Sequence, residues 1–303
     1  MSAHIVVLGS LNMDLVIRVP HLPQPGETIT GHSFAQVPGG KGANQVVAMS
    51  KLGARVRMIG RVGQDAYGAQ LLESLTSAGV DAGLVARTAG ASTGLALIFV
   101  DDQGENVIVL EPGANQRLTP DDVRAGHAVI QGAGALLLQL EVPLDTVLHA
   151  ARVAHEEGVR VVLNAAPARP LPDALLALVD VLIVNETELA LISGSSGGHE
   201  QAARTLLARG ARSVLVTLGR EGSLLVQSES TTHMPAFAVE AVDSTAAGDA
   251  FTGAYVVALL DGLDSRACLR FASAAAAIKV TRHGAQPGLP SRREVEDFLA
   301  TNG

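Results

Sequence analysis

Two short apolar runs enclose a segment of helical periodicity in ALLLQLEVPLDTVLHAARVAHEEGVRVVL, residues 135–163. The runs are Ala135–Leu140 and Val159–Leu163, and the segment between them is Leu144–Glu157. Short runs that are apolar throughout are typical of strands buried on both faces, and a helix between two such strands is the unit of a parallel sheet. This stretch therefore predicts a strand, a helix and a second, parallel strand.

The same alternation extends through the rest of the chain. Four further apolar runs are predicted to be buried strands: Ile5–Leu8, Val56–Gly60, Val179–Val184 and Ser213–Thr217. Further segments have helical periodicity: Asn44–Leu52, Ala66–Ala78, Leu171–Leu178, His199–Arg209 and Ala250–Leu260. We predict an α/β fold in which helices cover both faces of a mostly parallel sheet.

Two segments interrupt this rhythm and predict a second, smaller sheet. Pro20, Pro23 and Pro25 separate extended segments near the N-terminus, and a polar turn separates two apolar runs within residues 94–110. We predict a single domain over residues 1–303, with segments of about 15–38 and 94–112 forming a small β-sheet lid. The exposed apolar face of such a sheet needs a cover, and substrate or a second copy of the chain, in a homodimer, would provide one.

Composition excludes several classes of protein. Lys and Arg number 22 against 30 Asp and Glu, and the resulting net charge of −8 argues against nucleic acid as a partner. Cys268 is the single cysteine, so we expect no intrachain disulfide and no cysteine-based zinc site. No apolar stretch reaches the length of about 18 residues that a membrane helix needs. These features predict a soluble protein of the cytoplasm with no membrane partner.

Polar side chains follow two of the predicted strands where ligands bind in parallel sheets. Asn12 and Asp14 come shortly after Ile5–Leu8 and share one face of an extended segment, and Glu141 follows Ala135–Leu140. Amide and carboxylate groups at this edge suit the vicinal hydroxyls of a sugar. The alternatives are ordinary turn chemistry for Asn12 and Asp14 and a solvated acid for Glu141.

A glycine-rich turn, Gly39-Gly40-Lys41-Gly42-Ala43-Asn44, opens a predicted helix. Glycine lets the backbone approach a ligand closely, and Lys41 and Asn44 place polar donors beside the turn. The Walker spacing of a phosphate-binding loop is absent. The turn is therefore either part of a ligand site or a plain connection from strand to helix.

Two further turns have the composition of a nucleotide site. Asn185-Glu186-Thr187-Glu188 combines an amide with carboxylates that suit Mg²⁺, although acidic residues are also common at the start of a helix. Thr217-Leu218-Gly219-Arg220-Glu221-Gly222 is either a hairpin turn or a loop around nucleotide phosphates.

The stretch Ala241–Phe251 carries the strongest chemical signal. Ala246, Ala247 and Gly248 lead into an apolar helix, so their N–H groups would stabilise developing negative charge. Asp249 lies in the first helical turn, where it would take a proton from a hydroxyl nucleophile. An acidic helix start without a catalytic role is the alternative.

These motifs together resemble the ribokinase-like (PfkB) family of carbohydrate kinases. Gly39–Asn44 with Gln45, and Asp243–Asp249, match the two diagnostic regions of the family, and the resemblance extends from Gly9 to Pro287. It implies a three-layer sandwich with a mostly parallel central sheet and a small β-sheet lid. It also implies transfer of phosphate from ATP to a sugar, with Mg²⁺ and a monovalent cation, usually K⁺, as cofactors.

The resemblance assigns roles to individual residues. Sugar would be bound by Asn12, Asp14, Gly40, Lys41, Gly42, Asn44, Glu141 and Asp249. Asp249 would be the base, and Ala246, Ala247 and Gly248 would form the anion hole. ATP would contact Asn185, Thr217, Leu218, Gly219, Gly222, Gly248 and Ser273. Glu188 would position Mg²⁺ through water, and K⁺ would bind Asp243, Thr245, Lys279, Arg282, Gly284 and Gly288, mostly through backbone oxygens.

Within this family the motifs favour D-ribose, phosphorylated at O5. The alternatives are a kinase of this family that acts on another sugar, such as deoxyribose, and a sugar-binding protein without catalytic activity. A dinucleotide-dependent oxidoreductase is rejected because Gly9-Ser10-Leu11-Asn12 lacks the Gly-x-Gly-x-x-Gly pattern after the first strand. Members of the family often carry Ser where this chain has Gly288, a departure expected to weaken the K⁺ site.

Overall fold

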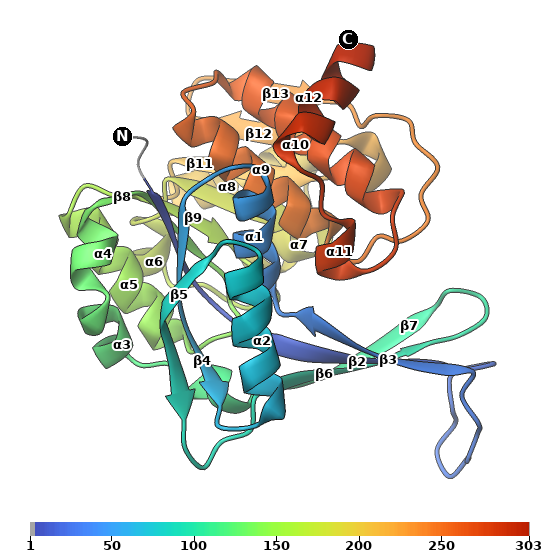
Figure 1. Cartoon of the computed structure of the whole chain (residues 1–303). Coiled ribbons are helices and arrows are strands. Elements are labelled where there is room, and N and C mark those ends of the chain that lie inside the picture. Colours follow the sequence, from blue (N-terminus) through green and yellow to red (C-terminus); the bar gives the residue numbers. More distant parts are fainter. Residues whose placement is uncertain (1–3, 303) are drawn as a thin grey trace.

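The computed structural model describes residues 4–302. Its large sheet consists of β1 (His4–Leu8), β4 (Val56–Gly63), β5 (Asp81–Thr88), β8 (Ala133–Leu138), β9 (Arg160–Asn164), β10 (Val181–Asn185), β11 (Ser213–Thr217), β12 (Ser223–Gln227) and β13 (Thr231–Met234). The strand order is β13-β12-β11-β10-β9-β8-β1-β4-β5. Strands from β11 to β5 run parallel, and β12 pairs antiparallel with both β11 and β13. The predicted α/β fold with a mostly parallel central sheet is confirmed (Figure 1).

Helices cover both faces of this sheet. One face packs against α1 (Lys41–Lys51), α2 (Ala66–Ser77), α9 (Ala247–Leu260), α10 (Ser265–Val280) and α12 (Arg292–Thr301). The other packs against α3 (Pro120–Ala125), α4 (His127–Gln131), α5 (Leu144–Glu156), α6 (Asp173–Leu176), α7 (Glu186–Ser193) and α8 (His199–Ala208). Short helical segments are η1 (Gly113–Arg117), η2 (Gly219–Glu221) and α11 (Ala285–Gly288). In residues 4–302 every helix is too short or too polar to cross a bilayer.

The side chains of β1 show why the central strands are apolar throughout. Ile5 and Val7 belong to the core that includes α1 and α9, whereas Val6 and Leu8 belong to the core that includes α5. All four side chains are fully buried. A strand with a helical layer on each face has no position left for a polar side chain, so alternation disappears.

A second, four-stranded sheet extends from the body of the molecule (Figure 1). Its strands are β2 (Asn12–Arg18), β3 (Ser33–Gly39), β6 (Gly94–Val100) and β7 (Asn106–Glu111), in the order β3-β2-β6-β7. The apolar runs and polar turn expected within residues 94–110 form the antiparallel hairpin β6–β7. Asp14 pairs with Ala96 in the parallel ladder between β2 and β6, so the sheet begins beside the carboxyl end of β1.

Two element boundaries differ from the prediction in a way that matters for the site. β8 ends at Leu138, two residues earlier than predicted, and this leaves Gln139 and Glu141 in the connection beyond the strand. Helix α1 begins at Lys41 rather than Asn44, because Gly40 adopts a φ of 88° and ends β3 abruptly. Both shifts place polar residues at the edge where the strands end.

Candidate active site

The site lies where the chain changes direction across the large sheet. Strand β1 lies between β4 and β8, so the following connections diverge from its carboxyl end. In open α/β sheets such a divergence leaves a crevice in which ligands bind. Asn12 and Asp14 follow β1, and Glu141 follows β8, so the three predicted sugar-binding residues lie at this edge.

The glycine-rich turn is pressed against the backbone that follows β1. A Cβ at Gly40 would lie 2.7 Å from the Asn12 nitrogen, and one at Gly42 would lie 2.7 Å from the Ser10 nitrogen. The Gly42 N–H also donates to Ser10 Oγ at 3.3 Å. These two glycines therefore permit close packing of backbone on backbone, which sets the position of Lys41 and Asn44.

Glu141 is held by protein donors rather than solvated. Its Oε2 accepts hydrogen bonds from the Lys41 N–H at 3.2 Å, from Asn12 Nδ2 at 3.5 Å and from Ser10 Oγ. Asn12 is oriented in turn by Asn115, whose Nδ2 donates to Asn12 Oδ1 at 2.7 Å. Ser10 and Asn115 were not predicted as site residues, and each acts on a predicted residue through a contact more than 100 residues away in sequence.

Asp14 is a buried carboxyl group in a negatively charged environment. Its exposed fraction is 9%, and no side-chain or backbone donor within residues 4–302 forms a hydrogen bond to its carboxylate. Burial, followed by the nearby charges of Glu141 and Asp249, raises the pKa of Asp14 from 3.8 to about 7. Its two oxygens are therefore open to a ligand that brings its own donors, as a sugar hydroxyl does.

Asp249 is held in place by amide groups from α1. Asn44 Nδ2 donates to its Oδ2 at 3.1 Å, and Gln45 Nε2 donates to its Oδ1 at 2.9 Å. The same Gln45 amide donates to Asn164 Oδ1 at 2.9 Å, and Gln139 Nε2 donates to Gln45 Oε1 at 2.6 Å. With an exposed fraction of 8%, Asp249 is a buried carboxylate with fixed orientation at the start of α9.

Gln45, Asn164 and Gln139 were missed as site residues by the sequence analysis. The sequence carries a weak signal for them, since Gln45 ends one diagnostic region and Gln139 lies in the same connection as Glu141. Their partners are 94 to 204 residues away, so no local pattern shows what they contact.

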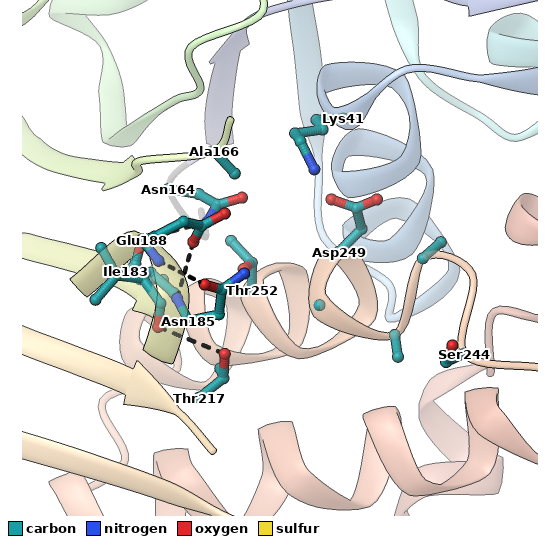
Figure 2. A pocket seen from close by; sticks show the side chains of 14 residues that line it. Lys41, Asn164, Ala166, Ile183, Asn185, Glu188, Thr217, Ser244, Asp249 and Thr252 are labelled. Atoms are coloured by element: carbon teal, nitrogen blue, oxygen red, sulfur yellow. Dashed lines mark hydrogen bonds between the residues drawn. The ribbon is translucent and has the colours of Figure 1, made fainter. Parts of the chain in front are cut away.

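Lys41 projects into the same cavity as Asp249 (Figure 2). Burial alone would lower the pKa of its ammonium group, but the carboxylates of Asp249, Glu141 and Glu188 outweigh burial and raise it. The ammonium group is therefore a positive centre among these three carboxylates.

The N-terminus of α9 carries the three residues that the sequence predicts as an anion hole. Ala246 adopts a left-handed conformation with a φ of 58°, which costs a non-glycine residue about 1–2 kcal/mol. The Ala247 N–H donates to Ser244 O at 3.1 Å, so this amide already has a partner in the turn. Gly248 is the second residue of the helix, next to Asp249, and N–H groups of a first helical turn have no partner within the helix.

Asn185 and Thr217, two of the residues predicted to contact ATP, line the same cavity as Asp249, whereas the lining does not include Leu218, Gly219, Gly222 or Ser273. Asn185 caps α7 through a reciprocal pair of 2.8 Å hydrogen bonds with Glu188, and Thr217 faces them from the end of β11 (Figure 2). Leu218, Gly219 and Gly222 form the turn between β11 and β12, which is the hairpin that the sequence allowed. Ser273 on α10 is buried, and its Oγ has no hydrogen-bond partner in residues 4–302.

The residues present fit a Mg²⁺ ion that is held mainly by nucleotide phosphates and water. No cluster of three or more His, Cys, Asp or Glu suited to a metal occurs in residues 4–302. Glu188 lines the cavity, and burial raises the pKa of its carboxyl group although the Asn185 hydrogen bond and Lys41 oppose this. Mg²⁺ commonly takes only one or two protein carboxylates and keeps several waters, so one such group is sufficient.

The loop predicted to bind K⁺ does not fit a free cation. Asp243 accepts hydrogen bonds from the N–H groups of Thr245 and Gly284, both at 2.8 Å. The carbonyl oxygens of Asp243 and Arg282, two of the expected K⁺ ligands, each accept a 3.0 Å hydrogen bond from Lys279 Nζ. The chain's own ammonium group therefore lies where an ion bridging these oxygens would have to bind.

Comparison with known proteins gives a consistent result. The sequence pattern of the pfkB family carbohydrate kinases matches residues 2–292. The chain is 42% identical to a ribokinase of Haemophilus influenzae, with 99% of each sequence covered. It is 36% identical to a deoxyribokinase of Salmonella typhi, over 98% of the chain and 99% of the relative. The solved structure of an Arabidopsis thaliana ribokinase with ribose and ATP is 34% identical, covers 99% of each chain and superposes with a TM-score of 0.91.

The environment of Asp14 predicts a specific dependence of stability on pH. Because its folded-state pKa of about 7 exceeds the unfolded value of 3.8, the native protein binds the extra proton between these pH values. Stability relative to Asp14→Asn should therefore fall as pH rises from about 4 to 7, by roughly 3–4 kcal/mol in total, and then level off. Urea unfolding at several pH values measures the difference. Asp102→Asn, at the exposed tip of the β6–β7 hairpin, is the control, and parallel curves for wild type and Asp14→Asn would contradict the assignment.

Proposed function

Since the chain belongs to the pfkB family of carbohydrate kinases, we propose that it phosphorylates D-ribose at O5 with ATP, giving D-ribose 5-phosphate and ADP. Relatives that cover nearly the whole chain are ribokinases, and this supports ribose as the acceptor. The kinase fold and the site chemistry are compatible with other sugars, so the substrate is the part of the proposal that needs a direct test.

The observation that carries the proposal is the position of Asp249. Its carboxylate is buried, is oriented by Asn44 and Gln45, and shares a cavity with Lys41 and Gly248. A base next to donors for negative charge is what phosphoryl transfer to a hydroxyl needs. Asp249 takes the proton from the sugar hydroxyl while the hydroxyl oxygen forms a bond to the γ-phosphorus of ATP. The bond between this phosphorus and the β,γ-bridging oxygen breaks, and ADP leaves.

Sugar binding is assigned to the polar groups on the opposite side of Asp249. Asn12, Asp14 and Glu141 would present amide and carboxylate groups to vicinal hydroxyls, and Asn44, whose Nδ2 donates to Asp249, is assigned to the same sugar. Glu141 and Asn12 are already hydrogen-bonded to each other, which fixes their orientation before ligand arrives. Groups that need no reorganisation bind at lower entropic cost.

ATP is assigned to the groove between α7 and the β11–β12 turn. Asn185 and Thr217 line the groove, and Gly219 and Gly222 form the turn. Ser273 would contact the base of the nucleotide only after a local rearrangement, because its Oγ is buried. Mg²⁺ would be held by the phosphates, with Glu188 acting through water, and would neutralise phosphate charge. Lys41 and the N-terminus of α9 stabilise the phosphoryl oxygens during transfer.

The four-stranded sheet is proposed to act as the lid of this single domain. Asp14 lies on β2 of that sheet, so a ligand held by Asp14 is connected directly to the projecting strands. Closure would exclude water from the γ-phosphate and so limit hydrolysis of ATP. We assign the lid to segments of about 15–38 and 94–112, and we place the enzyme in the cytoplasm, where ATP is supplied.

A homodimer through the lid sheet follows from its exposed apolar surface. Five large apolar residues of this sheet are at least 44% exposed: Phe34, Val107, Ile108, Val109 and Leu110. Four of them, Val107–Leu110, are consecutive residues of β7, so both faces of this edge strand are apolar, and the sugar site can cover only one of them. A second copy of the chain would cover the rest.

Phosphoryl transfer to a panel of acceptors tests the proposed substrate. With Mg²⁺ and ATP, D-ribose should give the highest kcat/KM, with 2-deoxyribose as the competing candidate because a deoxyribokinase is among the relatives. Fructose and adenosine serve as controls, and chelation of Mg²⁺ should abolish transfer. If no sugar led to formation of ADP, the result would contradict the kinase proposal and favour a non-catalytic sugar-binding protein.

Replacement of the base provides the mechanistic test. Asp249→Asn should lower kcat by about 10²- to 10⁴-fold with little change in sugar KM, because the amide cannot accept the proton. Steady-state kinetics with D-ribose measures both constants. Asp261→Asn, at the opposite end of α9, is the matched control. Near-normal turnover by Asp249→Asn would show that another group is the base.

The mass in solution tests the dimer. At micromolar concentration light scattering should give about twice 31.1 kDa, and an aspartate at Ile108 or Val109, which lie on opposite faces of β7, should return the monomer. Leu191→Asp, on the 49% exposed Leu191 of α7, is the control. A monomeric wild-type chain would contradict the proposal.

A further inference from the structure

One fully buried ammonium group lies beside the loop that leads into α9. Lys279 lies in the last turn of α10, has an exposed fraction of 0%, and is the largest of the fully buried side chains in residues 4–302. Its Nζ donates to the carbonyl oxygens of Asp243 and Arg282, both at 3.0 Å. A lysine so deeply buried is rare unless its charge has partners. Burial lowers the pKa of the Lys279 ammonium group, the nearby Asp243 carboxylate opposes this shift, and two backbone oxygens accept its hydrogen bonds.

The packing around Gly288 shows that this placement is built into the fold. A Cβ at position 288 would lie 2.9 Å from Lys279 Cδ and 3.0 Å from its Cε. Real Cβ atoms essentially never come so close to a neighbour as the first of these distances. The absence of a side chain at Gly288 therefore makes the room that the lysine stem occupies.

The contacts of the ammonium group reach the catalytic loop in two steps. Asp243 begins the loop, and its carboxylate accepts from the N–H groups of Thr245 and Gly284. Three residues further, Ala246 holds its left-handed conformation directly before Gly248 and Asp249. A positive charge that fixes the Asp243 and Arg282 carbonyl groups thus helps to keep this unfavourable loop geometry.

We propose that the Lys279 ammonium replaces the monovalent cation of this site, so that the enzyme needs no K⁺ or other monovalent ion. The proposal builds on the kinase function inferred above. A free cation that bridged the same two oxygens would overlap Nζ and would be repelled by its charge. Lys279 acts here as a positioning residue, because it contacts the loop and not the reacting atoms.

Activity in different salts gives the first test. At a constant ionic strength of about 0.1 M, wild-type turnover should change less than about twofold between KCl and choline chloride. Lys279→Ala should lose turnover in choline chloride and recover about 5- to 150-fold with K⁺, because the vacated oxygens can take the ion. Lys279→Met fills the space without charge, so it should lose turnover in both salts.

Thermal unfolding gives a second test that does not depend on activity. The wild-type Tm should be the same in KCl and choline chloride, whereas the Tm of Lys279→Ala should rise with K⁺. Gly288→Ser should lower the Tm of the wild-type chain, because the new side chain meets the lysine stem, and should be tolerated in the Lys279→Ala background. This coupling shows whether the two residues form one unit.

The outcomes separate the two proposals. Three results would overturn the role of Lys279. The first is activation of the wild type by K⁺ above about fivefold, and the second is normal turnover of Lys279→Ala without K⁺. The third is a folded Lys279→Ala protein that K⁺ neither activates nor stabilises. Wild-type protein that phosphorylates no sugar in any salt would instead overturn the kinase function, while the unfolding data would still report on the lysine.

Discussion

The carboxylate of Asp249 is held by two neutral amides, and the rest of the site depends on this arrangement. Asn44 and Gln45 come from α1, whereas Asp249 begins α9, so the contact joins the two halves of the chain across about 200 residues. The amide donors fix the direction in which the carboxylate meets a sugar hydroxyl.

The charge balance around Asp249 explains why so many polar groups converge. Glu141, Glu188 and Asp249 act on one ammonium group, Lys41. Burial, followed by the charges of Glu141 and Asp249, raises the pKa of Asp14. The excess of carboxylates is tolerable because each of the other acids either accepts protein hydrogen bonds or borders the nucleotide groove. Hydroxyl donors from a sugar on one side and Mg²⁺ with phosphates on the other would complete this balance.

Local patterns predicted the parts of the structure that depend on local chemistry. The run Ser213–Thr217 is β11 as predicted, since its three central residues, Val214–Val216, are apolar as expected of a strand buried on both faces. Asn12, Asp14 and Glu141 meet because parallel strands end at one edge. The amides of Gln45, Asn115 and Asn164 carry no such signature, because a buried amide has a role only through its distant partners. Element boundaries also shifted where Gly40 ended a strand.

Lys279 and Gly288 show that a departure from a family pattern also cannot be interpreted without the residues that it contacts in the fold. Taken alone, Gly288 predicted a weaker K⁺ site through one lost ligand. In the structure the missing side chain makes room for the stem of Lys279, whose ammonium group holds the carbonyl oxygens instead. The two residues therefore form a single physical unit. A tethered charge is positioned when the chain folds, whereas a dissolved ion loses translational freedom each time it binds. Catalytic-loop geometry then becomes a property of the fold and not of the ionic composition of the solution.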